Sequence, residues 1–115
     1  MMREKLKPRR AGLTLEMIFK RHDGSEIKFF VTFGFDEYRR VKECFCLPAK
    51  SGTDLQSLIH HACIGISVGL QHGATMAEYA RALGEDDPVI APQSIIGLIV
   101  RAGVKLDAEQ PRAVG

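Results

Sequence analysis

The amino-acid sequence predicts an α+β fold, in which a three-stranded antiparallel β-meander is followed by three helices packed on one face of the sheet. Apolar residues alternate with polar ones over residues 13–47, whereas they recur at helical spacing from residue 54 to about residue 103. A run of strands followed by a run of helices is typical of α+β proteins. The chain has 115 residues, 45% hydrophobic and 26% charged, so we expect one globular domain with one core.

The three strands are predicted by alternation and by the turns between them. The first spans residues 13–20 and is apolar at every second position. The pair Asp23-Gly24 then favours a tight hairpin, because glycine accepts a positive φ angle. The second strand, residues 26–35, places four apolar residues on one face, and the third covers residues 41–47; the four residues are Phe29, Val31, Phe33 and Phe35.

Capping residues mark the starts of the helices. Thr53 with Gln56, and Thr75 with Glu78, each have the spacing of a capping box. Gly84 is expected to end the second helix, and the third helix is expected to run from about Ser94 to Gly103.

The first helix is the longest, and its apolar residues, which include Leu55, Leu58 and Ile59, follow the helical period. Between residues 62 and 70 it carries one polar side chain, that of Ser67, so we expect its middle to be buried on nearly all sides. Gly65 and Gly69 lie one turn apart, and this spacing lets another backbone approach closely, within the domain or across a homodimer.

The charge of the chain is distributed unevenly. Residues 1–50 contain 12 Lys and Arg against 7 Asp and Glu, whereas residues 51–115 contain 4 against 7. We expect residues 1–12 to form a flexible basic arm, residues 13–106 the domain, and residues 107–115 a frayed tail. The arm offers candidate phosphate contacts, but no aromatic residue for base stacking lies among them, so a solubilising tail is favoured over nucleic-acid binding; the five residues are Arg3, Lys5, Lys7, Arg9 and Arg10. Basic residues near the sheet would extend such a surface: Lys28, Arg39, Arg40 and Lys42.

Three cysteines and a histidine form the candidate metal site. On a strand, Cys44 and Cys46 point to the same face, and Cys63 with His61 on the next helix would supply further ligands. The spacing matches no zinc-knuckle or redox motif, and the favoured interpretation is that the cysteines are small buried apolar residues. We therefore predict no cofactor.

No catalytic residue is predicted. The glycines form neither a dinucleotide-binding motif nor a phosphate loop, and the Ser-His pairs on the first helix lack a carboxylate partner. No segment has the length and hydrophobicity of a membrane span or a signal peptide, so we expect a cytoplasmic protein.

Four segments carry a resemblance to a known family: KSGTDLQSLI at 50–59, ACIGISVGLQHG at 62–73, MAEYA at 76–80 and PQSIIG at 92–97. Together they resemble the small TSCPD-type domain, which occurs near the C-terminus of adenosylcobalamin-dependent ribonucleotide reductases and as short free-standing proteins. The Thr-Ser-Cys-Pro-Asp string that names the domain is absent, as is the terminal cysteine pair of the reductases. The resemblance therefore implies an accessory or regulatory module connected with deoxynucleotide synthesis. It implies a ribonucleotide reductase large subunit as partner, and no activity of the chain alone.

Overall fold

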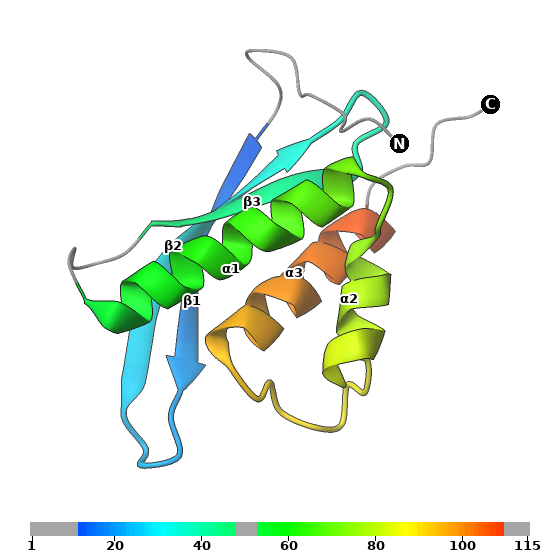
Figure 1. Ribbon diagram of the computed structural model, residues 1–115. Helices are drawn as coiled ribbons and strands as arrows, with labels where there is room; N and C mark the ends of the chain where they lie inside the picture. Colours follow the sequence, from blue (N-terminus) through cyan, green and yellow to red (C-terminus); the bar gives the residue numbers. More distant parts are fainter. Residues whose placement is uncertain (1–11, 48–52, 110–115) are drawn as a thin grey trace.

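The computed structural model describes residues 12–47 and 53–109 and confirms the α+β class (Figure 1). Three strands come first and three helices follow: β1 (Gly12–Lys20), β2 (Glu26–Phe35), β3 (Val41–Leu47), α1 (Asp54–Gln71), α2 (Met76–Leu83) and α3 (Ile95–Glu109). The predicted basic arm lies outside the described residues, except for Gly12, which begins β1.

The sheet is an antiparallel meander with the strand order β1-β2-β3. The hairpin between β1 and β2 turns at Gly24, whose φ of 89° is the positive value that the Asp-Gly pair predicts. In the register of the sheet, Leu15 lies opposite Val31, and Val31 lies opposite Cys46. These residues share the face that the helices cover, whereas Phe30 and Phe45 on the other face are 43% and 40% exposed.

The helices pack on the sheet through α1, which lies along β3, while α2 packs mainly on α3 (Figure 1). Thr75 forms the predicted capping box with Glu78. At Thr53 the structure shows one of the two predicted bonds, in which the Thr53 hydroxyl accepts from the Gln56 N–H. Gly84 ends α2 in the left-handed conformation, as predicted. Within the described residues, no helix is long and apolar enough to cross a membrane.

The expectation that the middle of α1 is buried on nearly all sides is wrong. Cys63, Ile66 and Leu70 face the core, but Ile64 is 42% exposed and Gly65 is also exposed. A three-stranded sheet covers one side of a helix, and α3 touches only part of the remainder. The apolar composition of this helix therefore leaves hydrophobic surface in contact with solvent.

The expectation that Gly103 ends the third helix is also wrong, because α3 continues to Glu109. A Cβ atom at Gly103 would come within 2.6 Å of the Met76 side chain, so this glycine allows α2 to pack closely on α3. Leu106, one turn later, is 8% exposed. Burial of these side chains offsets the low helix propensity of an interior glycine, which is unfavourable by about 1 kcal/mol.

Candidate functional site

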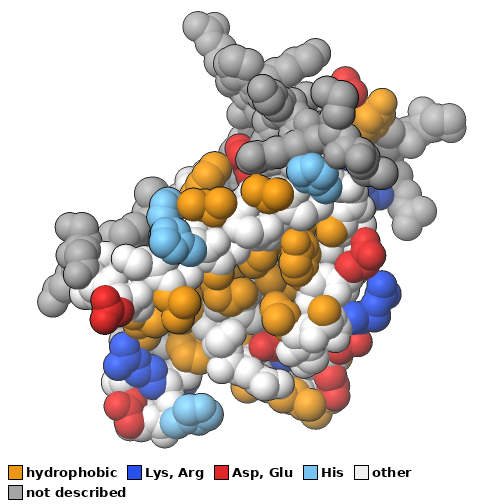
Figure 2. Space-filling view, viewed as in Figure 1, with side chains coloured by type: hydrophobic (Ala, Val, Ile, Leu, Met, Phe, Trp, Pro, Cys, Tyr) orange, Lys and Arg blue, Asp and Glu red, His pale blue; other side chains and the backbone are white. Residues whose placement is uncertain are grey.

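An apolar groove opens between the β1–β2 hairpin and the first turns of α1 and α3. It consists of two adjoining cavities of about 240 and 410 Å³ that share five lining residues. On the face seen in Figure 2, hydrophobic side chains gather between α1 and α3. The shared residues are Arg21, Ile27, Leu55, Ile59 and Ile95.

The first turns of α1 supply the exposed apolar wall of the groove. Thr53 fixes the start of the helix, and Leu55 and Leu58 follow it with 43% and 68% of their surface exposed. Both leucines have the spacing of core residues, so their sequence positions alone did not predict exposure. Contiguous exposed apolar surface of this kind is typical of a contact site for another molecule.

The three cysteines meet in the core beside the groove. Cys44, Cys46 and Cys63 are free thiols and are 0%, 8% and 1% exposed, and Cys46 also lines the smaller cavity. A hydrogen bond to the Cys63 thiol and burial both raise the pKa of Cys44, while accepting that bond lowers the pKa of Cys63. Burial raises the pKa of Cys46 to about 11. The thiols of Cys44 and Cys46 are therefore protonated at neutral pH, which makes them weak nucleophiles.

The remaining member of the candidate metal site does not join the cysteines. His61 is exposed on α1, and its ring lies 5.8 Å from that of His60. Residues 61 and 63 are separated by about 200° around a helix, so Cys63 points inward while His61 points outward. In residues 12–47 and 53–109, no three His, Cys, Asp or Glu side chains are grouped so as to hold a metal ion.

Ser67 is the polar residue that connects α1 to β3. Its hydroxyl accepts from the Cys44 N–H at 3.0 Å, and it lies 2.8 Å from the Cys63 carbonyl oxygen, to which it donates. The residue is 4% exposed. Its hydroxyl therefore satisfies backbone groups that would otherwise be buried without a partner.

The two glycines predicted to allow close packing differ in their surroundings. A Cβ atom at Gly69 would overlap the Tyr79 hydroxyl, so this glycine makes room for an α2 side chain. A Cβ atom at Gly65 would meet nothing within 4 Å. Packing of Gly65 across a dimer therefore stays a prediction.

Most of the basic residues near the sheet make contacts within the chain. Lys28 forms an ion pair with Glu16 at 3.0 Å, Arg40 donates to the Asp107 carbonyl oxygen, and Lys42 donates to that of Leu70. Arg39 is exposed and has a positive φ of 63°. The five candidate phosphate contacts of the arm lie outside the described residues.

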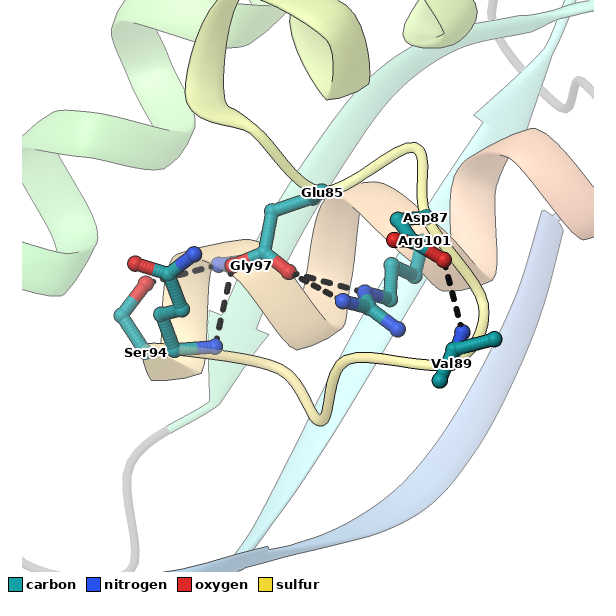
Figure 3. Close-up of polar contacts among 7 residues, drawn as sticks. Glu85, Asp87, Val89, Ser94, Gly97 and Arg101 are labelled. Atoms are coloured by element: carbon teal, nitrogen blue, oxygen red, sulfur yellow. Dashed lines mark hydrogen bonds and ion pairs between the residues drawn. The ribbon is translucent and has the colours of Figure 1, made fainter.

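A buried ion pair, which no sequence pattern predicted, holds the connection between α2 and α3 (Figure 3). The Glu85 side chain is 2% exposed, and Arg101 Nε donates to its Oε1 at 2.8 Å. Glu85 Oε2 accepts from the Gln93 N–H at 3.0 Å. Since both carboxylate oxygens are used in contacts within the chain, Glu85 fixes the loop that leads into α3.

Comparison with known proteins finds a relative among the ribonucleotide reductases. The chain is 34% identical over 80 residues to a vitamin B12-dependent ribonucleotide reductase of Bradyrhizobium diazoefficiens. The chain is related in sequence to this reductase. The aligned region is 70% of this chain but 6% of the reductase, so the chain corresponds to a small part of that protein. No protein-family model matches the chain, and no solved structure matches it.

Proposed function

We propose that the chain is a non-catalytic accessory module of the TSCPD type, which binds the large subunit of an adenosylcobalamin-dependent ribonucleotide reductase in the cytoplasm. We also propose that it forms a homodimer. The observation that carries the first proposal is the sequence similarity to a vitamin B12-dependent reductase. The similarity extends over 80 residues, and these make up 6% of the reductase. The proposed role is an assisting one, because the aligned segment represents only 6% of the reductase.

The apolar groove is the proposed contact surface for the reductase. Leu55 and Leu58 form an exposed wall, Ile27 and Ile95 lie deeper, and the charged residues among the lining are Arg21 and Lys28. Burial of exposed leucines against apolar side chains of a partner is favourable by about 25 cal/mol per Å². The basic side chain of Arg21 beside this surface favours a partner segment that is apolar and acidic.

Binding is tested with the full chain and the vitamin B12-dependent reductase encoded in the same genome, under reducing conditions. Leu58→Glu places a charge on the groove wall, and we expect it to weaken binding about tenfold or more. Ile64→Glu is the matched control, because Ile64 is an exposed apolar residue of the same helix outside the groove lining.

Calorimetry of the parent chain and both variants separates the outcomes. Binding by the parent chain and by Ile64→Glu, with weak binding by Leu58→Glu, supports the proposal. Absence of binding by the parent chain would overturn the accessory role. Equal binding by all three chains would exclude the groove as the contact surface.

A further inference from the structure

The outer edge of β1 presents backbone groups that β2 does not use. The Arg21 N–H donates to the Ser25 carbonyl oxygen at 2.8 Å across the hairpin. In an antiparallel pair, the residues that bond to the partner strand alternate with residues whose N–H and C=O groups point away from it. Counting back from Arg21, the even-numbered residues direct their backbone groups outward: Thr14, Glu16, Ile18 and Lys20.

The opposite edge of the sheet is occupied by contacts within the chain. The Cys44 N–H donates to Ser67, the Val41 N–H donates to the Asp107 carboxylate at 2.9 Å, and Gln71 Nε2 donates to the Lys42 carbonyl oxygen at 3.3 Å. Side chains of α1 and α3 therefore bond to the outer backbone groups of β3. This difference makes β1 the edge at which a further strand can pair.

We propose that this strand is β1 of a second copy, paired antiparallel about a two-fold axis at Ile18 to form a continuous six-stranded sheet. The inference rests on the homodimer of the proposed function and adds the surface and the register. With the axis at Ile18, each Glu16 lies opposite Lys20 of the other copy. Outward-directed backbone groups then meet one another at positions 16, 18 and 20.

Charge selects this register among those that the backbone allows. An axis at Glu16 would place the two Glu16 carboxylates opposite each other, which is destabilising. An axis at Met17 would place Glu16 opposite Ile18, so neither Glu16 nor Lys20 would face an opposite charge across the seam, which is the contact between the two β1 strands. The axis at Ile18 gives two Glu16–Lys20 pairs, on the sheet face where Glu16 already forms an ion pair with Lys28 at 3.0 Å.

The same register pairs apolar side chains on both faces of the sheet. Ile18 is 50% exposed and would lie opposite its own copy. On the face that the helices cover, Met17 would lie opposite Phe19 of the other copy, and both are partly buried residues at the margin of the core. Cross-strand pairs of this kind stabilise a sheet, so both opposite charges and hydrophobic contacts would stabilise the seam.

Charge-exchange variants of the full chain test the register. In Glu16→Lys and in Lys20→Glu, like charges face each other across both pairs of the proposed seam. We expect each variant alone to dimerise about tenfold to a hundredfold more weakly than the parent chain at low salt. An equal mixture should recover association, because lysines at 16 and 20 of one variant would then face glutamates at 20 and 16 of the other.

Sedimentation equilibrium measures association over a roughly hundredfold concentration range, and circular dichroism checks that each variant is folded. Dimeric parent chain, weakened single variants and a recovered mixture support the inference. A monomeric parent chain would overturn the homodimer itself and this seam with it. A dimeric parent chain whose single variants dimerise equally well, or whose mixture does not recover, would overturn the seam and leave the homodimer in place.

Amide exchange in the parent chain gives a test without substitution. Raising the concentration should slow exchange of the outward-directed Glu16, Ile18 and Lys20 amides, and should change that of Met17 and Phe19 much less. Association without this alternation along β1 would place the interface elsewhere.

Discussion

The carboxylate of Glu85 occupies the space that a side chain at position 97 would fill. A Cβ atom at Gly97 would lie 2.6 Å from the carboxyl carbon of Glu85 and would overlap its Oε2. The acid is held in this place by Arg101 and by the Gln93 N–H (Figure 3). The glycine and the buried ion pair therefore form one unit that fixes the first turn of α3 to the preceding loop.

Gly97→Ala should lower the free energy of unfolding by about 1–3 kcal/mol, because the backbone or the ion pair must shift to admit the methyl group. In a chain that already carries Glu85→Ala, the same substitution should not lower the free energy of unfolding, because the overlapping carboxylate is gone. Urea denaturation of the parent chain, the two single variants and the double variant measures the coupling energy between positions 85 and 97. Equal cost in both backgrounds would show that Glu85 is not what excludes the methyl group.

Ser67→Ala removes the hydroxyl that bonds to the backbone of β3 and α1. The Cys44 N–H would remain buried without its acceptor, so we expect a loss of about 1–3 kcal/mol in the free energy of unfolding. Ser57→Ala is the matched control, since Ser57 is exposed on the same helix, and it should be neutral within about 0.5 kcal/mol. Similar effects of the two substitutions, measured by chemical denaturation, would contradict the role of Ser67.

Substitutions of the two glycines of α1 should change stability in opposite directions. Gly69→Ala places a methyl group on the Tyr79 hydroxyl and should be destabilising. Gly65→Ala meets open space and should raise the free energy of unfolding by about 0.5–1 kcal/mol through helix propensity. Thermal melts of both variants measure this difference, and destabilisation by Gly65→Ala would mean that another chain packs on that turn.

Asp107 should make stability depend on pH. Burial raises the pKa of Asp107 above its ordinary 3.8, although the Val41 N–H donates to its carboxylate and opposes the shift. The folded chain therefore holds the proton more tightly than the unfolded chain. The contribution of this group to stability is complete below a pH of about 4 and is lost as the pH rises through the raised pKa.

Asp107→Asn keeps an oxygen acceptor for Val41 but cannot ionise. We expect the Asn variant to gain stability relative to the parent chain as the pH rises from about 4 to about 7. Denaturation across this range measures the difference, and a difference that stays constant or falls with pH would contradict the expectation. Asp107→Ala loses the acceptor as well and should be less stable than the Asn variant throughout.

Features that depend on neighbouring residues in the chain were the ones that could be predicted. The Asp23-Gly24 hairpin and the Thr75 capping box depend on local backbone geometry, and both have the predicted form. Gly103 did not end its helix, because a tertiary contact with Met76 determines its role. Leu58 has the same periodic pattern as a core residue, and only the size and position of the sheet leave it in solvent.

In the candidate site, too, local features could be predicted and features that depend on tertiary packing could not. Cys44 and Cys46 share a strand face, as alternation requires, and Cys63 reaches them because α1 packs along β3. The groove combines residues from the hairpin and from two helices that are distant in sequence. The groove exists because of how these elements pack, and the sequence pattern of a single segment does not predict that packing.

The thiols of Cys44 and Cys63 lie between α1 and the sheet, and this placement ties their oxidation to the integrity of the domain. A water-soluble oxidant or alkylating reagent reaches Cys44 and Cys63 only after the helix separates from the strand. Damage at these sulfurs would thus accumulate on chains that have already opened, and a damaged thiol would hinder their closing again. Folded chains therefore keep Cys44 and Cys63 out of reach of such reagents.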